Sequence, residues 1–205
     1  MKNIILKTTA AAAALMALTS IAAADVTAVA VTDLNIRSGP GPQYPIVGAI
    51  GANQEAVIGG CQEGSKWCVV SHNGVDGWAY SDYLMAPFGG ERVVLTERPS
   101  EALPPVSYEA TSSVRTEVVH GELIGRKTAL GTIEPIPAPP AEIRTYVEAH
   151  SAEPVYLDGE VVVGAALPDT VEVREIPDYQ YRYVYVNQQP VLVEPETRRI
   201  VYVLR

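Results

Sequence analysis

Cys68 and His72 lie four positions apart, and a thiol close to an imidazole suits nucleophilic catalysis. A catalytic cysteine also needs a third group that orients the base, and only the fold can bring that group close. Cys61 allows a different interpretation, because Cys61 and Cys68 enclose a turn-like stretch between two apolar runs. An even pair of cysteines in an exported chain favours a disulfide. We therefore expect Cys61 and Cys68 to be bonded and to close a hairpin.

Aromatic side chains near one arginine are the candidate ligand-binding groups. A ring is an apolar plate, with a polar tip in tyrosine, and suits the recognition of sugars and peptides. A guanidinium can hold a carboxylate through two parallel hydrogen bonds. The residues expected to line an exposed groove are Arg37, Tyr44, Trp67, Tyr80 and Tyr83. For Arg37 a structural hydrogen bond to a loop carbonyl is an equal alternative, and Trp78 is expected in the core.

Four tyrosines recur at every second position, at 179, 181, 183 and 185. In a strand such residues point to one face of the sheet. This row could stack on a ligand or cover a helix. We favour the helix, because a small sheet needs apolar contact area.

The sequence contains few other combinations that suggest chemistry. His72, His120 and His150 lie far apart, and none has the spacing of a metal-ligand pair. With only 2 cysteines and 3 histidines, a cysteine-rich zinc site is excluded. No nucleophile-elbow, phosphate-loop or paired-carboxylate motif occurs. We expect no enzyme activity, no metal and no cofactor.

The chain of 205 residues is acidic, with 15 basic and 24 acidic side chains and a formal charge of -9. Nucleic-acid binding needs clustered Lys and Arg, so we expect no nucleic-acid partner. The hydrophobic content of 47% supports a folded core and excludes full disorder. The 16 glycines and 16 prolines are too many for a protein made mainly of helices.

Residues 1–24 have the pattern of a secretory signal peptide. Lys2 and Lys7 precede the apolar run Ala10–Leu18, and Ala22–Ala24 supply small residues for cleavage before Asp25. The apolar run is shorter than the ~20 residues that span a bilayer, so we expect no transmembrane segment in the mature chain. The expected location is the periplasm or the exterior of the cell.

Residues 25–85 predict a small all-β domain. Short runs with strand-forming residues alternate with turn signals, and Asn73-Gly74 is typical of a type I′ hairpin turn. No helix of useful length fits this stretch. Many short strands with regular turns indicate a small barrel or sandwich.

Two motifs in this stretch resemble the bacterial SH3-like domains. Leu34-Asn35-Ile36-Arg37-Ser38-Gly39-Pro40 is similar to their opening motif, and Gly77-Trp78-Ala79-Tyr80-Ser81-Asp82-Tyr83-Leu84 to their closing motif. The resemblance implies an SH3-like barrel. It also implies attachment to the cell wall or recognition of a peptide, without catalysis.

Residues 86–138 are rich in proline and predict a largely disordered linker. Order is expected to return over residues 139–205, with a helix at Ala141–Ala149 that follows two prolines. Strands are expected at five further stretches: Glu160–Val163, Val171–Glu175, Tyr181–Val186, Pro190–Val193 and Arg199–Leu204. Together they predict a small α+β domain with one helix on a short antiparallel sheet.

This second half also resembles a known family. Val163-Gly164-Ala165-Ala166-Leu167-Pro168 and the closing Pro195-Glu196-Thr197-Arg198-Arg199-Ile200-Val201 are similar to an uncharacterised family of domains found at the C-terminus of small exported alphaproteobacterial proteins. The resemblance implies a fold and a compartment but no activity.

The sequence therefore predicts a mainly β protein with an SH3-like barrel, a proline-rich linker and a small α+β domain. The expected function is that of an exported, non-enzymatic cell-envelope protein whose barrel binds peptidoglycan or a peptide. The alternative is a periplasmic adaptor or structural protein that binds another protein through the tyrosine-rich sheet.

Overall fold

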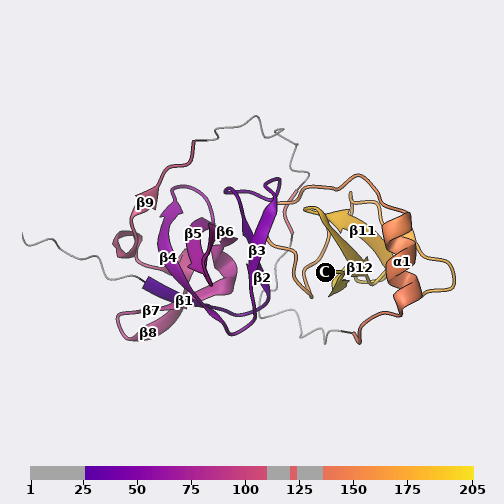
Figure 1. The fold of residues 1–205 in the computed structure, drawn as a ribbon, viewed down its shortest axis with the longest axis horizontal. Helices are drawn as coiled ribbons and strands as arrows, with labels where there is room; N and C mark the ends of the chain where they lie inside the picture. The colour runs from indigo at the N-terminus through magenta and orange to yellow at the C-terminus, as the bar shows by residue number, and fades with distance from the viewer. Residues whose placement is uncertain (1–25, 110–120, 124–135) are drawn as a thin grey trace, which may run out of the picture.

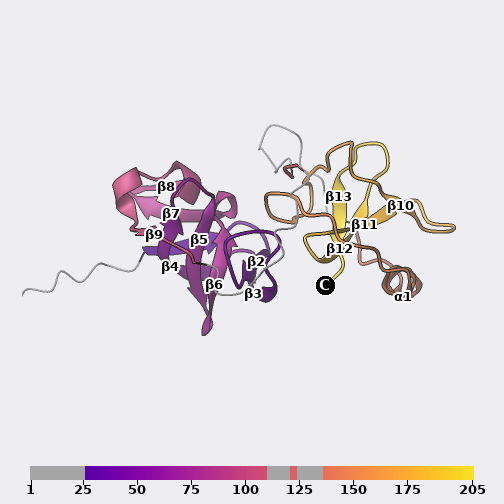
Figure 2. The same cartoon turned by 90° about the horizontal axis from the view of Figure 1, so that it is seen from above.

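A computed structural model of the chain describes residues 26–109, 121–123 and 136–205. The described residues form two lobes that lie side by side, a β-barrel and a smaller domain with one α-helix (Figures 1 and 2). The expected signal peptide, residues 1–24, lies outside the described residues. Among the described helices, none has the length and apolar character needed to cross a membrane.

The first lobe is built on one strongly bent sheet with the strand order β3-β2-β6-β5-β4-β1-β7-β8. These strands are β1 (Val26–Ala30), β2 (Leu34–Arg37), β3 (Ile46–Ile50), β4 (Glu55–Gln62), β5 (Trp67–His72), β6 (Val75–Tyr80), β7 (Leu84–Phe88) and β8 (Glu91–Val94). A short strand, β9 (Pro105–Val106), pairs in parallel with β4. The all-β domain expected over residues 25–85 is therefore present.

The hairpin between β5 and β6 has the predicted turn. Asn73 and Gly74 have φ values of 49° and 79°, which are the left-handed values that a type I′ turn requires. The turn brings His72 opposite Val75 and fixes the register down to Trp67 opposite Tyr80. A local signal in the sequence thus sets the register of the central strands.

The expected start of the linker at residue 86 is wrong, because the sheet continues beyond it. β7 crosses that boundary, and β8 returns along β7 after a turn at Gly89 and Gly90. Pro87 lies beyond the part of β7 that pairs with β1, so its missing N–H breaks no bond to β1. The proline-rich composition predicted a linker, but a proline such as Pro87 is also tolerated at the margin of a sheet. The later part of the expected linker, at 110–120 and 124–135, lies outside the described residues.

The second lobe has a four-stranded antiparallel sheet in the order β10-β11-β12-β13. Its strands are β10 (Arg174–Glu175), β11 (Arg182–Val186), β12 (Gln189–Val193) and β13 (Ile200–Val203). Helix α1 (Ala141–Ala149) begins after Pro140 as predicted. The stretch Glu160–Val163 is a loop, buried up to Val162, and not the expected strand, and Val171–Glu175 keeps only the two residues of β10.

The two faces of this second sheet have different partners. Tyr183, Leu192 and Val201 pack with Val147 of α1 in one apolar cluster. The alternate residues of the same strands, such as Val184 and Val186, join a larger cluster that also contains the barrel core. The prediction of a mainly β protein with a small α+β domain is confirmed, and the two lobes share buried apolar contacts.

Candidate functional site

The five residues predicted to line an exposed groove are all buried. Tyr44 and Tyr83 are 8% exposed, Trp67 and Tyr80 are 3% exposed, and Arg37 is fully buried. The expectation of an exposed groove on these side chains is therefore wrong. The physical reason is size, because a small barrel must use its large rings as core.

Arg37 points into the protein and holds the loop that follows β2. Its Nη1 donates hydrogen bonds of 2.9 Å to the carbonyls of Pro42 and Tyr44. Its Nη2 donates to the carbonyl of Asn187 at 3.4 Å, which belongs to the second lobe. Of the two interpretations of Arg37, the structure shows the bond to loop carbonyls.

Asn35 lies two residues before Arg37 on β2 and contacts the second lobe through its side-chain amide. Its Nδ2 donates to the carboxylate of Glu160 and, at 2.9 Å, to Oε1 of Gln189. Asn187 donates from its side chain to the carbonyl of Leu157 at 2.9 Å and accepts from the Leu157 N–H at 2.8 Å. These groups form what we call the interdomain seam: Asn35, Arg37, Glu160, Asn187 and Gln189.

The seam places one basic and one acidic side chain, Arg37 and Glu160, in the interior. Glu160 is 1% exposed, and its burial raises the pKa of the carboxyl group, while the charge of Arg37 and the hydrogen bond from Asn35 oppose that rise. Burial lowers the pKa of Arg37, against the attraction of Glu160, but a guanidinium stays charged at neutral pH. The buried Arg37 and Glu160 therefore each have a partner in the other lobe, at Asn187 and Asn35.

A second polar contact between the lobes surrounds Lys66. Its Nζ lies 2.9 Å from Oδ2 of Asp82 and 3.7 Å from Oε1 of Glu122, and 5.6 Å from the centre of the Tyr80 ring. Burial alone would lower the pKa of Lys66, but these carboxylates raise it. Burial and the nearby carboxylates, with Asp158 first among them, also raise the pKa of Tyr80. One lysine thus faces several carboxylates where the two lobes meet.

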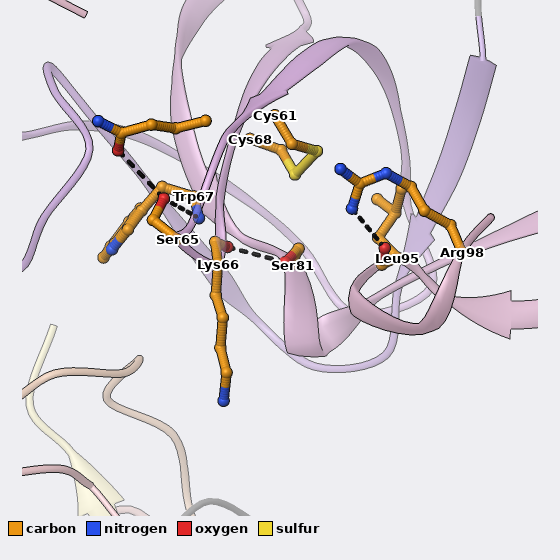
Figure 3. The surroundings of a disulfide bond; sticks show 9 residues. Cys61, Ser65, Lys66, Trp67, Cys68, Ser81, Leu95 and Arg98 are labelled. Carbon is orange, nitrogen blue, oxygen red and sulfur yellow. Dashed lines mark hydrogen bonds between the residues drawn. A yellow bond between two sulfur atoms is a disulfide. The ribbon is translucent and has the colours of Figure 1, made fainter. Parts of the chain in front are cut away.

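Cys61 and Cys68 form the predicted disulfide, opposite each other on β4 and β5 (Figure 3). The neighbouring Trp67 is held in the barrel, since its backbone N–H donates to Ser65 Oγ at 3.2 Å and its ring meets Tyr80 edge-on. Cys68 is therefore no nucleophile in this structure. His72 donates from Nδ1–H to the carbonyl of Glu55 at 2.7 Å, which is a structural contact.

Residues 103–108 cross the outside of the barrel, and we call this segment the strap. At its end, the ring of Tyr108 meets Tyr44 and Trp78 edge-on, with centroids 5.5 Å from each. Burial raises the pKa of Tyr44, and a hydrogen bond with the Tyr108 side chain adds to this. The strap thus closes over two of the barrel's aromatic rings.

Gly60 lets the strap approach β4. The N–H of Cys61 donates to the carbonyl of Pro104 at 3.2 Å. A Cβ atom at Gly60 would lie 2.5 Å from Val106 Cγ2 and 2.6 Å from that carbonyl, and Gly60 has a φ of 141°. Only glycine fits such a position without strain. The strap sits where β1 has stopped pairing with β4, because that ladder ends at Ile58.

Residues 32–85 match the bacterial SH3 domain family. Residues 146–205 match a second family, the domain of unknown function DUF1236. Both resemblances seen in the sequence are thereby confirmed. The comparisons with curated proteins and with solved structures gave no significant match.

The SH3 match ends at residue 85, so the strap and the strands β7 and β8 largely extend beyond the matched domain. Sequence reasoning missed three residues that organise the site: Asn35, Tyr108 and Glu160. Asn35 stood inside the opening motif, where a polar residue between two apolar ones was a usable signal. Tyr108 stood in the expected linker, and its position after Pro104-Pro105 gave no reason to place it on the barrel.

The described residues contain no group of three or more histidine, cysteine or acidic side chains arranged to hold a metal ion. The charged groups near the seam are engaged in holding the two lobes. What the barrel offers chemically is a strand edge on β4 next to aromatic rings. Such an edge provides main-chain hydrogen bonds, and neighbouring rings provide side-chain selectivity.

Proposed function

We propose that this protein is an exported, non-enzymatic cell-envelope protein whose SH3 domain binds an extended peptide. The peptide belongs either to peptidoglycan or to another envelope protein, and the chemistry of recognition is shared. The family match to bacterial SH3 domains supports binding as the role. The disulfide, together with the signal-like N-terminus, supports an oxidising compartment.

One observation carries the proposal. The edge of β4 beyond Ile58 accepts an extended, proline-containing segment of the chain itself, at Pro105 and Val106. The same segment places Tyr108 against Tyr44 and Trp78. Strand addition at a sheet edge, with a pocket for a side chain, is a recurring mode of peptide recognition. A surface that accepts one such segment has the geometry for another.

The contacts of the candidate catalytic groups support a non-enzymatic role. Cys68 is bonded to Cys61, and His72 bonds to a backbone carbonyl. The buried Glu160 accepts a hydrogen bond from Asn35 and lies near the charge of Arg37. These groups are arranged to stabilise the fold.

The geometry favours the SH3 domain over the tyrosine-rich sheet as the binding surface. Tyr183 donates from its hydroxyl to the His150 carbonyl, and Tyr185 donates to the Val147 carbonyl, both at 3.0 Å. Both rings therefore cover α1. An adaptor role for this face would first require α1 to leave it.

Cosedimentation of the purified protein with intact sacculi tests the wall-binding form of the proposal. Binding to an array of unmodified extended peptides tests the protein-binding form. The proposal expects one of the two to be saturable and to be lost when the SH3 domain is unfolded by reduction and mild denaturant. Both assays use the mature protein, whose N-terminus is expected near Asp25. Absence of binding in both assays would contradict the proposal.

A further inference from the structure

The strap covers the part of the barrel that has the features of a peptide site. Leu103 is 5% exposed and anchors one end, and Tyr108 covers the rings of Tyr44 and Trp78 at the other. Between them, Pro105 and Val106 run parallel to Cys61 and Gln62. The strap is thus bound as an added strand, with one aromatic side chain seated on two rings.

The strap is also a short ligand with few backbone donors. β9 has only two residues, and Pro104 and Pro105 carry no N–H. Val106, Ser107 and Tyr108 are half-buried or exposed. A contact of this size is held mainly by being tethered, because a tether gives a segment an effective concentration of the order of mM.

We propose that the surface under the strap is the peptide-binding site of the SH3 domain and that the strap is its internal ligand. This rests on the proposed function above. The external ligand is an extended peptide with a β-branched residue two positions before an aromatic residue, as in Val106-Ser107-Tyr108. The bare backbone at Gly60 receives the β-branched residue, and Tyr44 with Trp78 receives the ring.

Competition with the tether sets the expected behaviour. In the wild-type protein an external peptide must displace a segment present at about mM effective concentration. When the strap loses its anchoring side chains, the same peptide meets an open site. The apparent affinity for the peptide then rises by about tenfold or more.

Fluorescence anisotropy with a labelled synthetic peptide of residues 102–109 tests this. The test protein is the full-length Val106→Ser/Tyr108→Ala variant, with the wild type beside it. The control variant is Tyr181→Ala, which removes a half-buried tyrosine that has a single ring contact in the other lobe. The control peptide carries Ala at the position of Tyr108. The strap variant is expected to bind the intact peptide about tenfold more tightly than the wild type does. The Tyr181→Ala variant and the control peptide are expected to show no such gain.

Hydrogen exchange in the wild type tests the strap without relying on any variant. The Cys61 amide, which donates to the strap, is expected to exchange at least ~100-fold faster than the Val70 amide of the central strand β5. Equal exchange of both amides by global unfolding would overturn the proposal. So would a folded strap variant that binds the peptide no better than the wild type.

Sacculus binding, measured on the same proteins, separates this inference from the proposed function. If the strap variant gains peptide binding and no protein binds sacculi, the peptide site stands and wall binding falls. If the wild type binds sacculi and the folded strap variant never gains peptide binding, the inference falls and the envelope function stands on another surface.

Discussion

Glu160 accepts a hydrogen bond from the side-chain amide of Asn35, a residue 125 positions earlier in the chain. This contact joins the loop before β10 to β2 of the SH3 domain inside the interdomain seam. Arg37 lies two residues further along β2 and binds the Asn187 carbonyl of the same lobe. The opening motif of the SH3 domain therefore serves as the docking surface for the second domain.

Replacing Arg37 tests how strongly the seam holds the fold. Arg37→Met leaves the carbonyls of Pro42 and Tyr44 without their donor and Glu160 without its counter-charge. We expect a loss of about 3–5 kcal/mol in the free energy of unfolding, measured by urea denaturation. The exposed Arg92→Met is the matched control and should change it by less than ~0.5 kcal/mol. Equal stability of both variants would mean that Arg37 does not hold the seam.

The pH dependence of stability should report on Glu160. Its pKa in the folded protein is raised above the ordinary value of 4.5 by burial, so the folded state binds this proton more tightly than the unfolded chain. Protonated Glu160 therefore contributes fully to the free energy of unfolding below about pH 4.5. This contribution is lost as the pH rises through the raised pKa.

Urea denaturation of the wild type and Glu160→Gln across pH 4–8 measures this effect. The stability of the wild type minus that of Glu160→Gln should fall as the pH rises, because glutamine cannot ionise. The exposed Glu172→Gln controls for the general loss of one acidic group. A difference that stays constant, or that grows with pH, would contradict the expected direction.

The disulfide should stabilise the barrel through the unfolded state. The Cys61→Ala/Cys68→Ala variant is expected to lose roughly 2–3 kcal/mol, because the bond closes a loop with a sequence separation of 7 in the unfolded chain. A reductant should lower the denaturation midpoint of the wild type and leave that of the double variant unchanged. If the reductant affects both equally, its effect does not arise from this bond.

The tyrosine hydroxyls of β11 should hold the end of α1. The last carbonyls of a helix lack partners within the helix, and Tyr183 and Tyr185 donate to two of them, at His150 and Val147. Tyr183→Phe and Tyr185→Phe should each cost about 1 kcal/mol and speed hydrogen exchange in the last turn of α1. Tyr181→Phe, whose ring meets Tyr179, is the control. Unchanged exchange in all three would show that ring packing alone docks the helix.

Local patterns in the sequence predicted most elements of this protein, although not β8 and β9. Asn73-Gly74 specified a hairpin because few residues tolerate two successive left-handed conformations. Pro140 and the spacing of Ile143, Tyr146 and Val147 specified α1, and the alternating tyrosines specified which face of β11 meets it. The two motifs of the SH3 domain and the closing motif of the second domain identified both families.

Only the tertiary structure decided what surrounds each candidate side chain. The same Arg37 could have faced solvent or a loop, and its burial depends on Asn187 and Glu160, which no local pattern relates to it. Tyr108 was assigned to a linker because proline density outweighs one aromatic residue, yet it covers Tyr44 and Trp78. Secondary structure follows from interactions a few residues apart. Exposure follows from which distant surfaces meet, and that is determined by the packing of the whole chain.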